Sequence, residues 1–165
     1  HARHRFLDLV GDRLRLARPL VADEEMFFAN YSDVLTDVSL DDMVERMHAS
    51  PAAAAMMLSV RPHATFHVIN TREDDTVSGF HLLEELPIRE NGGYLIMRQS
   101  FFDHLGGGRD LDAAFAELLP TRRLIAYRHD GFWLPADTFK ERAHLDAMYG
   151  SGNVPWGRRG VVTVP

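Results

Sequence analysis

The sequence predicts an α/β fold with a mixed sheet. Two observations lead to this class, and a third, the composition, indicates that the chain folds. Short apolar runs, typical of buried strands, alternate along the chain with segments whose apolar residues recur at helical spacing. Residues that favour helix caps stand at the start of such helical segments. The apolar fraction of 45% and the charged fraction of 25% are those of ordinary globular proteins. We expect residues 1–165 to form a single domain, closed by a turn-rich, surface-wrapping tail over 149–165.

The first half of the chain predicts a strand–helix–strand unit. The aromatic segment Met26–Tyr31 ends in a polar pair, as a central buried strand leading into a loop would. Ser39, with Asp42 three residues later, then caps a helix. The apolar residues of this helix fall at i, i+3, i+4 and i+7: Leu40, Met43, Val44 and Met47. Ala52–Val60 follows without alternation, which indicates a strand covered on both faces and completes a βαβ unit.

The second half predicts shorter strands and two flanking helices. Thr65–Asn70 and Thr76–Leu83 surround a polar run, which indicates a hairpin, and Gly92–Met97 is a further strand candidate. One helix is expected near 100–104 and another from Asp110. After them, the alternating segment RLIAYRHDGFWLP predicts one strand that bends at its Asp-Gly pair.

A last helix begins after this strand and ends near Tyr149. Thr138, followed three residues later by Glu141, has the form of a capping box. Asp137 therefore lies at a strand-to-helix junction. A carboxylate there can complement the positive end of the helix dipole, or it can hold a cation above the strand ends, where ligands of open α/β sheets bind.

Charge and composition narrow the classes of partner. The net charge of −6 and the pI near 5.8 disfavour binding to nucleic acid or to an anionic membrane. The absence of cysteine excludes disulfides, thiolate metal sites and a cysteine nucleophile. No apolar run reaches the length of about 20 residues that spans a bilayer. We expect a cytoplasmic protein that binds neither nucleic acid nor membrane.

Among the chemical motifs, a pair of aspartates is the most informative. His63 and His67 have the spacing of helical zinc ligands, but Pro62 and the strand-like residues around them favour surface or packed histidines. The glycines at 106–108 lack the lysine of a phosphate-binding loop and are typical of a turn. Asp33, in contrast, follows a predicted buried strand, as Asp137 does. Two carboxylates at two strand ends can share a divalent cation that neutralises phosphate charge.

Three segments carry a resemblance to a known family. EEMFFANYSDVLTDVSL, NGGYLIM and AYRHDGFWLPADTFKERAHLDAMYGSGNVPW resemble the C-terminal two-thirds of sugar-1-phosphate nucleotidyltransferases. The most specific landmarks occur in the family's order: His129–Trp133, Asp137-Thr138, His144-Leu145 and Pro155-Trp156. The resemblance implies a Rossmann-like nucleotidyltransferase fold with a mixed, mainly parallel sheet, seen here without its N-terminal portion.

The resemblance also implies a reaction and a set of site residues. A sugar 1-phosphate would attack a nucleoside triphosphate and release pyrophosphate, which forms an NDP-glucose-type product, with cytidine favoured by overall similarity. Asp33 and Asp137 match the family's two Mg²⁺ ligands and would be the catalytic pair. Asn91, Gly92 and Gly93 match a segment that lines the sugar pocket.

Departures from the family keep a second reading open. The family's glycine-rich loop is not found in these residues, and LLEELP stands where the family has Glu-Lys-Pro, so that position has no cation. Glu84 or Glu85 would then reach sugar hydroxyls, and Arg89 would supply positive charge nearby. A catalytically degenerate binding or assembly module is the alternative, and a structural interaction domain ranks third. Loss of the family's first strand would leave a sheet edge to be covered by a partner chain, a missing segment or a second copy, and among these we expect a homo-oligomer.

Overall fold

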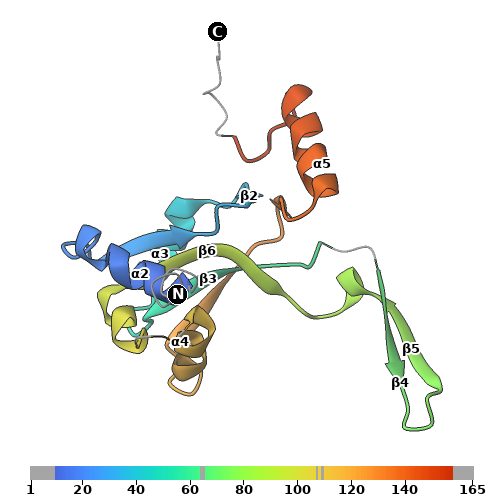
Figure 1. The fold of residues 1–165 in the computed structure, drawn as a ribbon, viewed down its shortest axis with the longest axis horizontal. Helices are drawn as coiled ribbons and strands as arrows, with labels where there is room; N and C mark the ends of the chain where they lie inside the picture. The colour runs from blue at the N-terminus through green and yellow to red at the C-terminus, as the bar shows by residue number, and fades with distance from the viewer. Residues whose placement is uncertain (1–9, 64–65, 107, 109, 158–165) are drawn as a thin grey trace, which may run out of the picture. The chain divides into compact units, whose positions relative to one another are not determined.

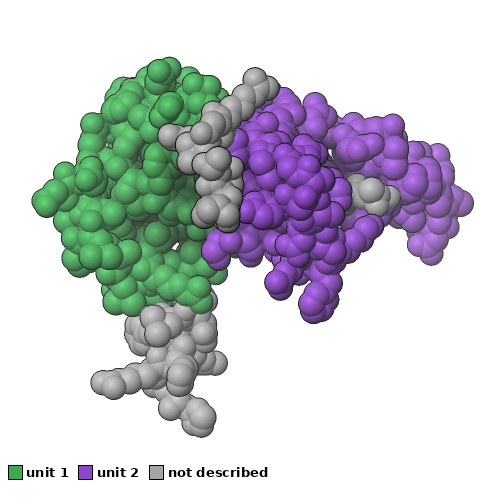
Figure 2. Space-filling view, turned by 90° about the horizontal axis from the view of Figure 1, so that it is seen from above, with its two compact units in different colours: residues 1–31, 39–58, 93–127 green, residues 32–38, 59–92, 128–165 purple. Residues whose placement is uncertain are grey.

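The computed structural model describes residues 10–63, 66–106, 108 and 110–157, and the chain divides into two compact units (Figure 2). Unit 1 comprises residues 1–31, 39–58 and 93–127, and unit 2 comprises residues 32–38, 59–92 and 128–165. Whether the whole chain acts as one domain stays a prediction. Of the expected tail over 149–165, residues 158–165 lie outside the described residues.

Unit 1 holds most of a four-stranded mixed sheet (Figure 1). Its strands lie in the order β1 (Met26–Asn30), β6 (Glu90–Arg98), β3 (Ala55–Val60) and β7 (Leu124–Arg128). β6 runs antiparallel to β1, and the bond from Arg98 N to Ala54 O indicates that it also runs antiparallel to β3. At the start of β3, Ala54 N donates to Arg123 O, and at its end Ser59 O accepts from His129 N, which indicates that β3 and β7 are parallel. Three of the four strands therefore share one direction.

Helices and tight turns cover this sheet within unit 1. They are α2 (Val10–Ala17), η1 (Arg18–Leu20), α3 (Leu40–His48), η3 (Gln99–His104) and α4 (Leu111–Leu118). The predicted cap of α3 is confirmed, because Ser39 Oγ accepts from Asp42 N at 3.1 Å. Asp110 caps α4 in the predicted place, with its carboxylate 2.8 Å from Leu111 N. The core between these elements contains Phe101, Leu95, Met97, Ala114 and Leu118, each nearly or fully inaccessible to solvent.

Unit 2 contains two small antiparallel sheets and one helix. Its elements are β2 (Val34–Thr36) with β8 (Trp133–Pro135), β4 (His67–Thr71) with β5 (Val77–Leu82), η2 (Leu83–Glu85) and α5 (Phe139–Gly150). β4 and β5 form the predicted hairpin, a two-stranded ribbon in Figure 1. One face of this ribbon pairs Ile69 with Phe80, and both side chains are more than half exposed.

Three expectations about the elements need correction. β1 is a strand, but it lies at one edge of the described sheet rather than at its centre, and Phe28 is 44% exposed. The segment expected as one bent strand is two strands, β7 and β8, which pair in different sheets because the chain breaks at Asp130–Gly131. The short helix expected near 100–104 is the 3₁₀ helix η3.

Candidate functional site

The β2–β8 ladder places Asp33 and Asp137 at the same end of one small sheet. The strands pair antiparallel, with Val34 opposite Pro135 at that end. One step further, Ala136 N donates to Asp33 O at 2.7 Å. Asp137 is the next residue after this bond. The ladder thus brings together the backbones of two aspartates that are far apart in the sequence.

The carboxylate of Asp137 is not used as a helix cap. Thr138 Oγ1 accepts from Glu141 N at 3.2 Å, and Glu141 Oε2 accepts from Thr138 N at 2.9 Å, so these two residues complete the capping box of α5 between them. Asp137 instead lines an open hollow of about 420 Å³ with Ala136, Thr138, Phe139 and Arg142. Both uses considered for Asp137, complementing the helix dipole and holding a cation, stay predictions.

The carboxylates of Asp33 and Asp137 are both available to bind a ligand. Both residues are exposed, and neither carboxylate has a hydrogen-bond partner among the residues that the structure describes. Within the same described residues, no cluster of three or more histidine and acidic side chains could enclose a metal. Two carboxylates without further protein ligands suit Mg²⁺, which is commonly bound through one or two carboxylates and keeps several waters.

The segment predicted to line a sugar pocket lies beside the same ladder. Gly92 and Gly93 are buried at the start of β6, and Trp133 of β8 donates its indole N–H to Gly92 O at 2.8 Å. Gly93 has a φ of +76°, a conformation that favours glycine over residues with a Cβ. Asn91, directly before them, is half-buried. Their predicted contact with a sugar stays a prediction.

The opposite end of the ladder carries a histidine–aspartate contact that the sequence did not reveal. His129 Nε2 lies 2.8 Å from Asp37 Oδ1, and because a carboxylate only accepts, the imidazole donates this bond. A Cβ at Gly131 would lie 2.6 Å from both Asp37 Oδ1 and His129 Cε1. Glycine at this position therefore makes the contact possible. His129 was identified only as a family landmark, and no sequence signal connects it with Asp37.

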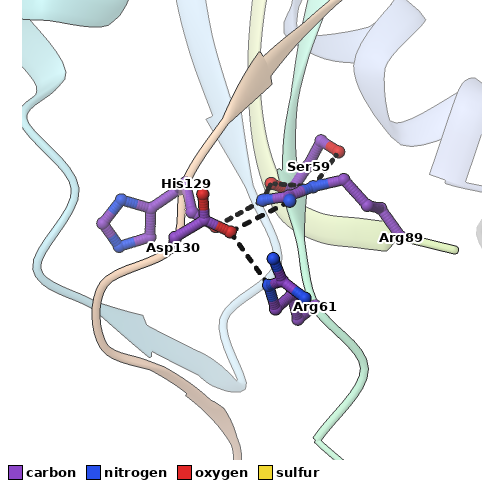
Figure 3. A network of polar contacts seen from close by, with 5 residues as sticks. All are labelled: Ser59, Arg61, Arg89, His129 and Asp130. Carbon is purple, nitrogen blue, oxygen red and sulfur yellow. Dashed lines mark hydrogen bonds and ion pairs between the residues drawn. The ribbon is translucent and has the colours of Figure 1, made fainter. Parts of the chain in front are cut away.

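Arg89 is engaged on all three of its guanidinium nitrogens by protein groups (Figure 3). Nη2 donates to Ser59 O at 3.0 Å and to His129 O at 2.7 Å, and Nε donates to Ser59 Oγ at 3.1 Å. Nη1 donates to Asp130 Oδ1 at 3.0 Å. The side chain of Arg89 is only 21% exposed, and its hydrogen bonds join the ends of β3 and β7 to the segment that contains Arg89. Its predicted contact with substrate stays a prediction.

Asp130 holds a second arginine as well. Arg61 Nε donates to Asp130 Oδ1 at 3.2 Å, the oxygen that also accepts from Arg89. The hydrogen bond from Arg89, and then that from Arg61, hold the pKa of the Asp130 carboxyl below its ordinary value. The sequence did not single out Arg61, and it indicated Asp130 only as part of a bend and of a family landmark, because single charged residues after strands carry no distinguishing pattern.

The remaining sequence candidates lie elsewhere in unit 2 or outside it. Glu84 and Glu85 are exposed in η2, where Glu85 Oε2 accepts from Leu82 N at 3.3 Å, and their role in binding sugar stays a prediction. His67 stacks on Phe80 with ring centroids 4.4 Å apart, which is a packing role. Of the glycines at 106–108, residue 107 lies outside the described residues, and residue 108 lies in a turn at a φ of +76°.

Comparison with curated proteins confirms the resemblance. The chain is 26% identical over 158 residues to glucose-1-phosphate cytidylyltransferase of Salmonella typhimurium, and 27% identical over 151 residues to a Bacillus subtilis protein described with the same activity. Each match covers 90% of this chain and 58% of the relative. The chain thus spans little more than half the length of the relatives that it matches. No family model matches the sequence.

Comparison with solved structures establishes the fold. A Bacillus anthracis protein described as a glucose-1-phosphate thymidylyltransferase, in complex with a sucrose, aligns with a TM-score of 0.64 and 14% identity, over 94% of this chain and 63% of its own. The UTP-bound UGPase of Acinetobacter baumannii aligns with a TM-score of 0.63 and 18% identity, over 87% of this chain and 56% of its own. The chain has the α/β fold of sugar-1-phosphate nucleotidyltransferases. Among its described helices, none is both long and apolar enough to cross a bilayer.

Proposed function

We propose that the protein to which this chain belongs is a Mg²⁺-dependent sugar-1-phosphate nucleotidyltransferase, which joins a sugar 1-phosphate to a nucleoside triphosphate with release of pyrophosphate. The observation that carries the proposal is the end of the β2–β8 ladder, where Asp33 O accepts from Ala136 N, directly before Asp137, and neither carboxylate has a hydrogen-bond partner among the described residues. The similarity to glucose-1-phosphate cytidylyltransferases supports this reaction class and favours glucose and cytidine.

Each group near this ladder has a part in the proposed chemistry. The carboxylates of Asp33 and Asp137 would hold Mg²⁺ together with water. When bound, the metal offsets negative charge on the triphosphate oxygens. Trp133 holds the carbonyl of Gly92 and thereby orients the Asn91–Gly93 segment, against which the sugar would lie. Holding the attacking phosphate close to the triphosphate turns the reaction into a step within one complex, which is a large part of catalysis.

One sequence feature favours a second candidate, a catalytically degenerate binding or assembly module. Leu86 occupies the position at which the family that this chain resembles has a lysine that neutralises the sugar phosphate. Glu84 and Glu85 precede it, and two carboxylates without that cation disfavour an anionic substrate. A degenerate module would keep the fold and would not depend on the two aspartates.

The test uses the full-length gene product. Pyrophosphate release is measured with Mg²⁺, glucose 1-phosphate and each of CTP, UTP and dTTP in turn. We expect Asp33→Asn and Asp137→Asn each to lower turnover about 100-fold or more, in line with the loss of one preorganised electrostatic contact in an active site. Asp23→Asn is the matched control, since Asp23 is an exposed aspartate of unit 1 with no contact in this site.

Two further outcomes separate the candidates. Binding of Mn²⁺, followed by water proton relaxation, should weaken in both variants and stay unchanged in the control. Absence of pyrophosphate with every triphosphate, together with a biological role that survives both substitutions, would establish the degenerate module instead. The base that gives the fastest release identifies the nucleotide.

We further propose that the protein is a homo-oligomer. The exposed apolar face of the β4–β5 ribbon supports self-association, because an isolated two-stranded hairpin is marginally stable and gains from burial of that face. Light scattering of the purified protein measures the mass directly, and a monomer at micromolar concentration would refute this proposal. The expected cytoplasmic location stays a prediction.

A further inference from the structure

The guanidinium of Arg61 has two terminal nitrogens that are oriented by the bond at Nε and are available to donate hydrogen bonds. Its Nε is held by Asp130 Oδ1, whereas its two terminal nitrogens have no hydrogen-bond partner among the residues that the structure describes. The side chain is 61% exposed. An exposed arginine ordinarily samples many rotamers, and fixing the Nε edge leaves the terminal fork available in one orientation. That fork matches the two oxygens of a carboxylate or a phosphate.

The charged side chains around Arg61 carry a net positive charge, which favours the binding of an anion. Arg61 and Arg89 share one carboxylate oxygen of Asp130, so the three side chains together carry one positive charge (Figure 3). Each guanidinium nitrogen of Arg89 already donates to protein, and only Nη1 keeps a second N–H. Arg61, whose two terminal nitrogens have no partner among the described residues, is therefore the main donor for an anion that balances this charge, and the anion would lower the repulsion between the two guanidinium groups.

The position of Arg61 sets the anion apart from the paired aspartates. Asp130 lies just before Phe132, whose carbonyl accepts from Asp37 N at the far end of the β2–β8 ladder. Asp33 is at the near end of the same ladder, four residues before Asp37 along the chain. At a rise of about 3.3 Å per residue the two ends are separated by about 13 Å. We therefore take the anion at Arg61 to be a different group from the phosphate that would react beside Asp33 and Asp137.

We propose that Arg61 binds an acidic group at the end of the sugar remote from its reacting phosphate, so that the preferred substrate is an acidic sugar 1-phosphate rather than the glucose 1-phosphate that the similarity to relatives favours. The group is a carboxylate, as in a uronic acid 1-phosphate, or a second phosphate, as in a hexose bisphosphate. Asp130 and Arg89 are positioning residues that hold the Arg61 guanidinium in place. The identity of the ligand as a sugar 1-phosphate rests on the proposed function, whereas the anion site rests on Arg61 alone.

Calorimetric titration of the full-length protein, without metal or nucleotide, tests the inference. The probes are glucose 1-phosphate, glucuronic acid 1-phosphate and glucose 1,6-bisphosphate, and the two acidic arms distinguish carboxylate from phosphate. We expect at least one acidic probe to bind roughly tenfold more tightly than glucose 1-phosphate, the size of a charge-assisted hydrogen bond. In Arg61→Ala that preference should disappear while the affinity for glucose 1-phosphate is unchanged, and Arg61→Lys should restore part of it.

A matched control and a simpler anion complete the design. Arg72→Ala removes an exposed arginine at the end of β4, which donates to Thr76, and should leave all affinities unchanged. Equal affinity for all three sugars in the wild type, or a preference that survives Arg61→Ala, overturns the inference. If no sugar phosphate binds, inorganic phosphate separates the two failures. Phosphate binding that depends on Arg61 keeps the anion site and overturns its assignment to a sugar 1-phosphate, and phosphate binding that is independent of Arg61 refutes the anion site. The proposed function is refuted separately, by the absence of pyrophosphate release with Mg²⁺ and every triphosphate.

Discussion

Replacing Arg89 by methionine should destabilise unit 2 strongly. Methionine keeps the apolar stem of the side chain and removes the guanidinium. The change takes away the donors to the Ser59 and His129 carbonyls and to the Ser59 hydroxyl, at distances of 2.7 to 3.3 Å. These acceptors lie at the ends of β3 and β7, so the loss releases the segments that lead into Arg61 and Asp130.

The expected loss in the free energy of unfolding follows from the number and kind of hydrogen bonds that Arg89→Met removes. A hydrogen bond to a charged group contributes about 1.5–3 kcal/mol, and bonds from one guanidinium are not additive. Because the Arg89 side chain is 21% exposed, water replaces part of what is lost. We leave out the contact with Asp130, since exposed ion pairs contribute little. The expected loss in the free energy of unfolding is about 3 kcal/mol.

Urea unfolding followed by tryptophan fluorescence measures this loss selectively. The chain has two tryptophans, Trp133 and Trp156, and both belong to unit 2. Asp130→Asn should barely move the midpoint, and Arg72→Met is the matched control for removing an arginine at the surface. A loss in Arg89→Met below about 0.5 kcal/mol, the range of ordinary surface substitutions, would show that the guanidinium does not clamp these strand ends.

Three other substitutions test separate features. Thr138→Ala removes the cap of α5 and should cost about 1 kcal/mol in the same urea assay, and an unchanged midpoint would contradict the capping box. Gly131→Ala places a Cβ 2.6 Å from Asp37 Oδ1, so the imidazole NMR signals of His129 should shift as its bond to Asp37 breaks; unshifted signals would disprove the contact. Met56→Ala opens a cavity at a fully buried position and should cost about 3 kcal/mol, measured by circular dichroism because the tryptophans lie in unit 2. A cost below 1 kcal/mol would mean that the core collapses around the smaller side chain.

Local patterns were sufficient to predict much of the fold. Capping residues act on backbone groups three residues away, so Ser39 and Thr138 could be identified without any knowledge of tertiary structure. The same holds for the hairpin of β4 and β5, in which a short polar turn joins two apolar segments. Helical spacing likewise predicted the buried side of α3, where Met43 and Met47 are fully inaccessible.

Features that depend on distant pairing could not be predicted in this way. The apolar sequence of β1 indicated a strand but did not show that it would be an edge strand of the described sheet, because that depends on which strands pair beside it. The Arg61–Asp130 contact joins residues 69 positions apart, and the Arg89–Asp130 contact joins residues 41 apart. Neither pair has a spacing that a local rule recognises.

The placement of the Asp33 and Asp137 backbones at one end of the ladder depends on the register of β2 against β8. In a strand, side chains alternate between faces, so a slip of one residue would turn one strand's side chains to the other face and remove the bond between Ala136 N and Asp33 O. The ladder itself is only three residue pairs long, which specifies register weakly. Two side-chain bonds add to it: Thr36 Oγ1 donates to Phe132 O at 2.8 Å, and Trp133 Nε1 donates to Gly92 O.

These two bonds come from residues that the sequence suggested for other reasons or not at all. Trp133 was identified as a family landmark, and Thr36 carried no signal. Both bonds are formed only in the observed register, because each joins one named donor to one backbone carbonyl. The backbone proximity of Asp33 and Asp137 is thus a product of the ladder and of the two donors that fix it. It follows that a chain could keep both aspartates and still lose this proximity through a change at Thr36 or Trp133.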